Sequence, residues 1–363
     1  MSEHIVIVGG GIVGCMTAMA MVDRGHRVTI VERNQIASQT SGESSWAGGG
    51  IIFPLLPWMY SEPVNQLTAY GAKSYQQICE RLERETGLPT GFINSGFLLL
   101  PPYDQTAAIA WCKQHQQAYE LVTKVDSQLA SHHQGNQQAL WMPQVCQARP
   151  PYFMKALRQW LVQNNVTLLE QTELSPLNEI KPLAAWKTLA GAEIKADKFV
   201  VTSGAWSFHL LKSVADKLNI KPMRGQILLY QPAQNLKQIV YKDGFYMIPR
   251  DDGQLLVGST LEDVGFDTSV TEEVKAELAT KAEAIMPALK GLPIIKHWSG
   301  LRPGTPENLP TISAHPHIKN LYLNTGHFRY GLTMAPASAR LVSELIAGES
   351  PFIDASPFAL AVG

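Results

Sequence analysis

A glycine-rich turn within the first fifteen residues constrains the fold more than any other part of the sequence. Gly9 to Gly14 match the pattern G-x-G-x-x-G, and the apolar run His4 to Val8 directly precedes them. The pattern predicts a helix from Ile12 to about Gly25 and a second strand from Arg27 to Glu32. A turn of this kind between a strand and a helix is typical of dinucleotide-binding β-α-β units. We therefore predict that the chain begins with one.

The residues of the turn have separate physical roles. Gly9 permits the tight turn, Gly11 lets the backbone approach a pyrophosphate, and Gly14 lets the helix and the strand pack closely. Ile12 and Val13 open the helix, where unpaired N–H groups and the positive end of the helix dipole favour phosphate. The turn is therefore expected to bind the phosphates of a dinucleotide.

Glu32 narrows the choice of dinucleotide. At the end of the second strand its carboxylate is expected to accept hydrogen bonds from a free adenosine ribose and to repel the 2′-phosphate of NADP. Arg33 beside it weakens that repulsion only slightly. A second glycine-rich loop, residues 47–50, lies where an extended cofactor would run past its phosphates. The sequence contains one G-x-G-x-x-G, whereas a flavoenzyme with a second domain for NADPH is expected to carry two, so the substrate itself is expected to supply the electrons.

Composition excludes several classes of protein. The formal net charge of −1 and the lack of like-charged runs give no indication of a nucleic-acid or anionic-membrane surface. The N-terminal apolar run lacks the basic flank of a secretory signal, and glycines and prolines interrupt the apolar stretch from Trp46 to Tyr60. The four cysteines (Cys15, Cys79, Cys112 and Cys146) form no CxxC pair and suit reduced thiols. We expect a cytoplasmic protein with no metal site, no nucleic-acid partner and no integral membrane segment.

The order of predicted strands indicates an α/β fold, α+β overall. Buried strands of the parallel type are expected near the start, the middle and the end of the chain, and short alternating strands between Gln226 and Val257. We predict a Rossmann-type domain assembled from discontinuous segments, residues 1–85, 145–220 and 300–363. An antiparallel-sheet substrate-binding domain, residues 86–144 and 221–299, is expected to be inserted into it.

Several local elements follow from the same patterns. Helices are expected at about 63–86, 154–163, 272–285 and 334–346. Residues 46–53 are expected to form a loop. The Gln- and His-rich stretch 104–140, which includes His132 and His133, is expected to be largely helical or loop and to form a solvated face.

Seven segments, which follow one another along nearly the whole chain, resemble those of a known protein family. They are Ile5–Gly14 with Glu32, Ser44–Gly50, Val200–Ser207, Pro222–Gln226, Tyr246–Arg250, Trp298–Pro303 and Gly326–Gly331. Together they resemble the D-amino acid oxidase superfamily of FAD-dependent oxidoreductases, and most of all its glycine oxidase branch. The resemblance implies FAD bound noncovalently, because no cysteine follows Cys146 where some relatives tether the flavin. It also implies oxidative deamination of glycine or a small D-amino acid to the imine and 2-oxo acid, with oxygen reduced to hydrogen peroxide.

The resemblance, with the glycine pattern, predicts a set of cofactor-binding residues. They are Gly9, Gly11, Ile12, Val13, Gly14, Glu32, Arg33, Ser44, Ser45, Ala47, Gly48, Gly49, Gly50, Thr172, Gly204, Trp206, Arg302, His327, Phe328, Arg329, Tyr330, Gly331, Leu332 and Thr333. Two positions depart from the family pattern: Tyr330 replaces a smaller polar residue, and Leu261 stands where a methionine lines some family pockets. The N-terminus of the helix at 334–346 is expected to face the flavin and to stabilise negative charge on it.

The substrate carboxylate requires a cation with planar, paired donors, which arginine offers. Arg302, in the turn Gly300–Gly304, matches the family's carboxylate-binding arginine, and Tyr246 matches a tyrosine whose hydroxyl donates to the same group. Arg329 is the third candidate for contact with the substrate. The resemblance implies hydride transfer to flavin N5 without a catalytic side-chain acid or base, so position and electrostatics carry the reaction.

Other functions remain open on the sequence alone. A D-amino acid dehydrogenase that passes electrons to a quinone or another carrier has the same pattern. A tRNA-modifying flavoprotein is disfavoured by the absence of a basic patch, and a noncatalytic flavin-binding protein by the presence of both Arg302 and Tyr246. The sequence is compatible with a homo-oligomer, and it leaves the preferred amino acid and its handedness undecided. If that amino acid is glycine, the resemblance implies supply of an imine for thiamine biosynthesis.

Overall fold

Strand β1 (His4–Val8) lies inside a six-stranded sheet, which explains its continuous apolar sequence. The structure is a computed structural model that describes residues 2–130 and 137–361, so the predicted solvated positions His132 and His133 lie outside the described residues. All neighbouring strands of this sheet pair in parallel except β18 with β19. In spatial order they are β18 (Thr311–Ala314), β19 (Leu321–Thr325), β12 (Lys198–Val201), β1, β2 (Arg27–Val31) and β9 (Thr167–Leu169).

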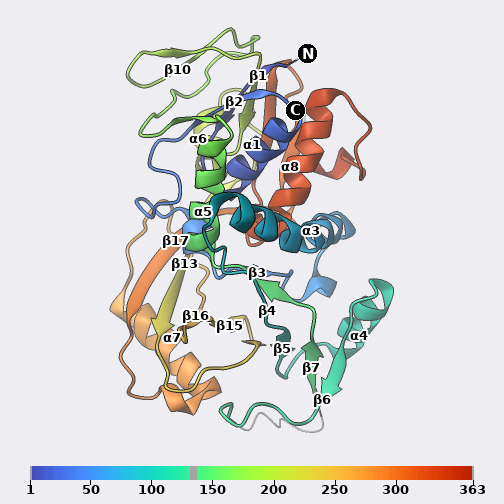
Figure 1. Cartoon of the computed structure of the whole chain (residues 1–363), viewed down its shortest axis with the longest axis vertical. Coiled ribbons are helices and arrows are strands. Elements are labelled where there is room, and N and C mark those ends of the chain that lie inside the picture. Colours follow the sequence, from blue (N-terminus) through green and yellow to red (C-terminus); the bar gives the residue numbers. More distant parts are fainter. Residues whose placement is uncertain (1, 131–136, 362–363) are drawn as a thin grey trace.

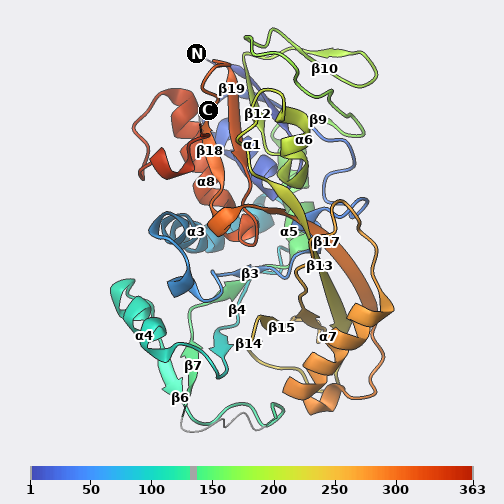
Figure 2. The same ribbon diagram turned by 180° about the vertical axis from the view of Figure 1, so that it is seen from behind.

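The two faces of this sheet bury different parts of the chain. Ile5 and Ile7 belong to one apolar cluster and Val6 to another, because successive strand residues point to opposite faces. On the first face α1 packs against α8, and α8 against α3, as Figures 1 and 2 show. The helices of this region are α1 (Ile12–Asp23), α2 (Ser44–Ala47), α3 (Glu62–Thr86), α5 (Pro150–Gln163), α6 (Ser207–Leu211) and α8 (Gly331–Ala347).

A second, eight-stranded sheet lies at the other end of the molecule (Figure 1). Its strands pair antiparallel except β14 with β5. In spatial order they are β17 (Lys296–Gly304), β13 (Lys221–Tyr230), β16 (Leu255–Gly258), β15 (Phe245–Pro249), β14 (Ile239–Lys242), β5 (Phe97–Leu99), β7 (Ala139–Met142) and β6 (Glu120–Val122). Met247 faces a cluster that contains residues of α7 (Glu272–Ile285), while Tyr246 faces the opposite side with Phe53 and Trp298.

Short elements complete the fold. A three-stranded sheet lies between the two large ones, and a two-stranded one lies at the far end of the parallel sheet (Figure 1). These strands are β3 (Ile51–Ile52), β8 (Cys146–Gln147) and β4 (Ile93–Asn94), and β10 (Trp186–Lys187) with β11 (Glu193–Ile194). The remaining helices are α4 (Gln105–Gln114) and the 3₁₀ turns η1 (Pro57–Met59), η2 (Gly204–Trp206), η3 (Pro287–Leu289), η4 (Pro306–Asn308) and η5 (Ser356–Phe358).

The predicted fold class is confirmed. A Rossmann-type sheet is assembled from segments that are distant in the sequence, and the strands of a mainly antiparallel sheet lie between those segments along the chain. The division of the chain into domains at the residues given above stays a prediction. Residues 46–53 are not simply a loop, because they include the end of α2 and the short strand β3. The stretch 104–140 includes strand β6 and the start of strand β7 besides helix α4, so its assignment as helix and loop was incomplete.

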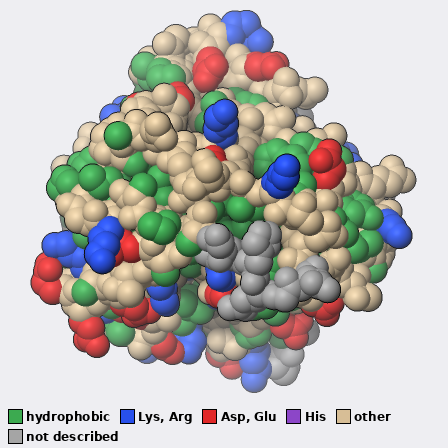
Figure 3. Space-filling model, turned by 90° about the horizontal axis from the view of Figure 1, so that it is seen from below, with side chains coloured by type: hydrophobic (Ala, Val, Ile, Leu, Met, Phe, Trp, Pro, Cys, Tyr) green, Lys and Arg blue, Asp and Glu red, His purple; other side chains and the backbone are tan. Residues whose placement is uncertain are grey.

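The described surface shows charges of both signs. On the face drawn in Figure 3, Lys and Arg side chains alternate with Asp and Glu, and apolar side chains are scattered among them. None of the helices in the described part of the chain is both long enough and apolar enough to cross a membrane.

Candidate active site

The glycine turn brings β1, α1 and β12 into close contact. A Cβ atom on Gly14 would lie 1.9 Å from the carbonyl oxygen of Gly9 and 2.6 Å from Oγ1 of Thr202, so only glycine fits there. The N-terminus of α1 carries no acidic residue in its first turn. Its Ile12 N–H donates to Oγ of Ser45 (2.9 Å), a hydroxyl from the second glycine-rich segment. The helix end thus faces the cavity without an acidic side chain, and the Ser45 hydroxyl lies beside it.

Glu32 is held by backbone donors at the end of β2. Its carboxylate oxygens accept hydrogen bonds from the N–H groups of Gly10 (2.7 Å) and Asn34 (2.9 Å). Arg33 points elsewhere: its guanidinium stacks on the ring of Trp206, 3.9 Å from the centroid, and donates to Ser41. Arg33 therefore forms no ion pair with Glu32 and does not cover the carboxylate beside the turn.

A single large cavity connects these groups with the antiparallel sheet. Its volume is about 260 Å³. Every residue predicted above to bind cofactor or substrate lines this cavity except Gly14, which packs the helix against the turn. Residues that the sequence analysis did not single out also line it, among them Phe53, Ser203, Ile227, Ser259, Asn324 and Thr325. The structure therefore gathers the predicted residues in one place, and their individual roles stay predictions.

The glycine loop at 48–50 is braced from behind by Arg250. This arginine is buried and donates to the carbonyl oxygen of Gly49 (2.8 Å) and to Oε1 of Gln147 (2.5 Å). Burial lowers the pKa of Arg250 to about 10, so it stays cationic at neutral pH. Trp298 also reaches this segment, through a hydrogen bond from its Nε1 to the carbonyl oxygen of Ala47 (3.0 Å). Arg250, directly after β15, and Trp298, on β17, thus connect this segment to the antiparallel sheet.

Arg302 projects into the cavity from β17. Its Nη2 donates to Oγ of Ser259 (2.7 Å) and its Nη1 to the carbonyl oxygen of Thr260 (3.1 Å). Burial lowers the pKa of Arg302. The neighbouring Tyr246 raises the pKa and partly offsets the effect of burial, whereas the positive charge of Arg329 lowers it further. No carboxylate among the described residues forms an ion pair with this guanidinium. The guanidinium has five N–H donors, more than these two contacts use, and Tyr246 lies beside it.

The turn after β19 supplies the remaining wall. The Arg329 side chain is exposed and lines the cavity, while His327 is buried with its Nε2 unpaired in the described structure. Burial lowers the pKa of His327 to about 3, so the ring is neutral. The Tyr330 hydroxyl lies 2.7 Å from the Tyr60 hydroxyl and 3.1 Å from the carbonyl oxygen of Leu55. Tyr330 therefore ties this turn to the segment after β3.

Helix α8 begins at the cavity. Gly331, Leu332 and Thr333 line it, and the first turn of the helix contains no acidic residue and no side-chain cap. The N-terminus thus faces the cavity, as expected from the sequence. Leu261, which stands where a methionine lines some family pockets, is 45% exposed and does not line the cavity. It lies in the loop after β16, whose neighbours Ser259 and Thr260 make the contacts with Arg302 instead.

Comparison with known proteins defines the family. Residues 4–345 match the family model described as DAO, FAD dependent oxidoreductase, and the chain belongs to this family. It is 40% identical to the glycine oxidase of Pseudomonas aeruginosa and 36% identical to that of Pseudomonas putida, with 99% of this chain covered in both cases, and 99% and 98% of those proteins. The crystal structure of glycine oxidase from Geobacillus kaustophilus superposes with a TM-score of 0.89 at 25% identity, over the full length of both chains. The chain is thus an FAD-dependent oxidoreductase of the amino acid oxidase class.

Proposed function

We propose that this enzyme oxidises glycine or another small amino acid and that molecular oxygen is reduced to hydrogen peroxide. One observation carries the proposal: Arg302, which has no carboxylate partner among the described residues, lies beside Tyr246 in the same cavity as the glycine turn. A buried guanidinium with free donors is suited to a carboxylate, because it binds both oxygens in one plane. The similarity to two glycine oxidases over nearly their whole length supports the small substrate.

The residues of the cavity fit FAD. Two helix N-termini, those of α1 and α8, face it without an acidic residue in their first turns. We infer that residues 9–13 hold the pyrophosphate, that Glu32 binds the adenosine ribose, and that residues 48–50 and 327–333 surround the ring end. When bound, FAD supplies the acceptor for the two electrons that leave the substrate.

The side chains of the cavity orient the substrate. Arg302 and Tyr246 bind its carboxylate, and Arg329 adds positive charge at the exposed side. His327 stays neutral because its pKa is near 3, so at neutral pH it carries no second proton that it could give up as an acid, and it is a weak base. The reacting form of the substrate has a neutral amine, whose lone pair is available. Fixing the carboxylate sets the direction of the α-hydrogen, and this positioning is the main contribution of the protein.

The overall reaction balances as follows. The amino acid loses two electrons and two protons and becomes an imine, which water converts to a 2-oxo acid and ammonia. Oxygen takes up the two electrons and two protons to give hydrogen peroxide.

The four free cysteines support the cytoplasmic location expected from the sequence, which remains part of this proposal.

An anaerobic screen of the holoenzyme tests the proposal. Glycine, sarcosine, and D- and L-amino acids are added separately, and loss of the visible flavin absorbance is recorded. We expect bleaching with glycine and other small amino acids, followed in air by one hydrogen peroxide per oxygen consumed. A flavin that an amino acid bleaches, but that an added dye and not oxygen reoxidises, would instead indicate a dehydrogenase. Absence of bleaching with every amino acid would overturn the proposal.

A further inference from the structure

Arg224 is a buried charge that does not touch the cavity. It lies on β13 next to Gly225, and its side chain is 5% exposed. Arg302 is paired with Met223 of β13 and therefore shares its face of the sheet. Successive strand residues point to opposite faces, so Arg224 lies on the face away from Arg302. It does not line the cavity, so direct contact with the substrate is excluded.

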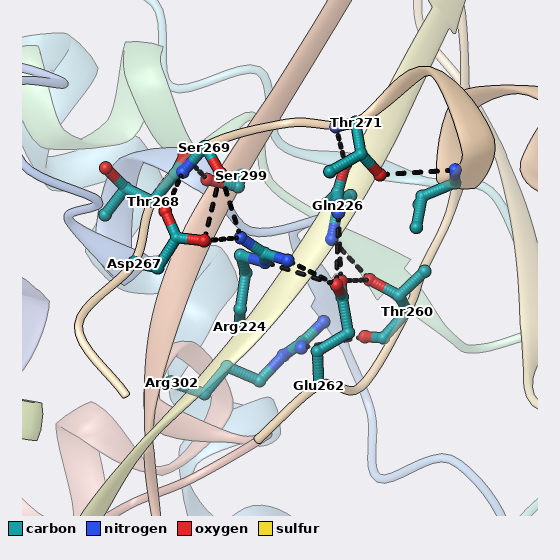
Figure 4. A network of polar contacts seen from close by, with 11 residues as sticks. Arg224, Gln226, Thr260, Glu262, Asp267, Thr268, Ser269, Thr271, Ser299 and Arg302 are labelled. Atoms are coloured by element: carbon teal, nitrogen blue, oxygen red, sulfur yellow. Dashed lines mark hydrogen bonds and ion pairs between the residues drawn. The ribbon is translucent and has the colours of Figure 1, made fainter. Parts of the chain in front are cut away.

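Arg224 is bound to the loop that follows β16. Its Nη2 and Nε donate to Oε2 of Glu262 (2.7 and 3.2 Å), and its Nη1 donates to Oδ2 of Asp267 (2.5 Å), as Figure 4 shows. The backbones of Arg224 and Glu262 also exchange two hydrogen bonds of 2.9 Å. This loop is therefore fixed to β13 by both its backbone and its charges.

Glu262 connects this ion pair to the residues that hold Arg302. Its Oε1 accepts a hydrogen bond from Oγ1 of Thr260 (2.5 Å), and Gln226 donates to both carboxylate oxygens. Thr260 in turn accepts Nη1 of Arg302 at its carbonyl oxygen (3.1 Å), and its neighbour Ser259 accepts Nη2 (2.7 Å). A continuous chain of contacts thus runs from Arg224 through Glu262 and Thr260 to the guanidinium in the cavity (Figure 4).

The ion pair is charged at neutral pH. Burial alone would raise the pKa of Glu262, but the hydrogen bonds from Arg224, Thr260 and Gln226 outweigh burial and lower it. A partly buried carboxylate with this many donors has one favoured orientation, since each rotation breaks several charge-assisted hydrogen bonds. Because the Thr260 hydroxyl donates to this carboxylate, the orientation of Thr260 depends on that of Glu262.

We propose that Arg224 and Glu262 are positioning residues that set the affinity of Arg302 for a carboxylate. The inference rests on the proposed function, in which Arg302 binds the carboxylate of the substrate. A guanidinium binds both oxygens only when its plane is aligned with them. Ser259 and Thr260 fix that plane, and the Arg224–Glu262 pair fixes Thr260, the neighbour of Ser259 in the chain.

Acetate binding to the holoenzyme tests the inference without turnover. The dissociation constant is measured from the change in flavin absorbance for the wild type, Glu262→Gln and a matched control, Glu170→Gln. Glu170 forms a comparable ion pair, with Arg158 at 2.7 Å, and its side chain is 19% exposed against 20% for Glu262. Neither carboxylate lines the cavity, but Glu170 bonds Arg158 and Ile36 and not the residues that hold Arg302. We expect Glu262→Gln to weaken acetate binding roughly three- to thirtyfold, the range typical of residues that act on a site without touching its ligand. The control is expected to bind acetate like the wild type.

The dissociation constant for FAD separates positioning from general damage. A positioning role requires unchanged FAD binding in Glu262→Gln, whereas parallel loss of FAD and acetate would overturn it. If Glu262→Gln yields no holoenzyme, Asp267→Asn is measured with the same two readings, because it removes the other, half-exposed carboxylate that binds Arg224.

An Arg302→Lys variant distinguishes failure of this inference from failure of the proposed function. If Arg302→Lys binds acetate as tightly as the wild type, the carboxylate site is elsewhere and the proposed function loses its basis. If Arg302→Lys binds acetate weakly while Glu262→Gln equals the wild type, only the positioning role of Glu262 is wrong.

Discussion

The guanidinium of Arg302 covers Gly225 on the neighbouring strand. A Cβ atom on Gly225 would lie 2.1 Å from Nη1 and 2.5 Å from Cζ of Arg302. Arg302 is paired with Met223 in the β13–β17 ladder, so Gly225 is its diagonal neighbour on the same face. The missing side chain at position 225 thus creates the space in which the guanidinium lies.

Replacement of this glycine is the first prediction. Gly225→Ala is expected to displace the guanidinium and to raise the KM for the amino acid at least about tenfold, since a carboxylate binds well only to aligned donors. FAD binding should be retained, because the glycine turn is far along the chain and on another sheet. Steady-state kinetics and an FAD titration check both parts. A wild-type KM would show that Arg302 does not need this space.

Removal of the guanidinium itself is the second prediction. Arg302→Ala is expected to raise the KM for the amino acid at least about thirtyfold, because truncation of one partner in a buried charge pair costs about 2–5 kcal/mol. Arg24→Ala, at a partly exposed ion pair with Glu349 at the end of α1, is the control and should keep the wild-type KM. An Arg302→Ala enzyme with unchanged KM would refute the assignment of the carboxylate site.

The third prediction concerns the glycine turn. Gly14→Ala places a methyl group against the carbonyl oxygen of Gly9, so helix α1 must move away, at a cost of about 1–3 kcal/mol in unfolding free energy. We expect weaker FAD binding as well, because the helix end moves with it. Gly10→Ala is the matched control, since the nearest atoms there belong to the side chain of Ile36, which can shift. Equal losses in the two variants would contradict the close-packing role of Gly14.

The fourth prediction is a pH dependence of stability due to His327. Its pKa is lowered by burial from 6.5 to about 3 in the folded state, so the unfolded chain binds a proton that the folded chain does not. Stability is therefore lost as the pH falls from about 6.5 towards 3, and the loss between pH 7.5 and pH 5 amounts to about 2 kcal/mol.

Denaturant unfolding of the holoenzyme at the two pH values measures this loss. His327→Gln should lose about 2 kcal/mol less than the wild type between pH 7.5 and pH 5. His317→Gln, at an exposed histidine, should follow the wild type. The burial argument fails if all three proteins lose the same amount.

Much of the cofactor-binding unit could be predicted from local sequence patterns. The apolar run at 4–8, the glycines and Glu32 lie within thirty residues, so periodicity and spacing are sufficient to place β1, α1 and β2. Strand β3 could not be found this way. It contains two residues and exists because it pairs with Cys146–Gln147, far away in the sequence. Strands β6 and β7 are short for the same reason and depend on their partners in the large sheet.

The candidate site divides in a similar way. Arg302 and Tyr246 were identifiable by residue type and motif, because a carboxylate ligand demands such donors. Ser259 and Thr260 were not, since they act through a side-chain hydroxyl and a backbone carbonyl, more than forty residues before Arg302. The role of Arg224 also depends on the fold, because its partners Glu262 and Asp267 lie about forty residues further along the chain.

Strands β13 and β17 pair at nine successive positions, and near the end of this ladder Leu301 is bridged to Glu43 beside the glycine loop. A rotation of the antiparallel sheet away from the glycine-rich segment would have to break this bridge between Leu301 and Glu43. We therefore expect admission and release of small molecules to depend on side chains and loops at the cavity mouth while Arg302 stays in place. The entropy of aligning the arginine is then lost once, during folding, and need not be lost again in every turnover.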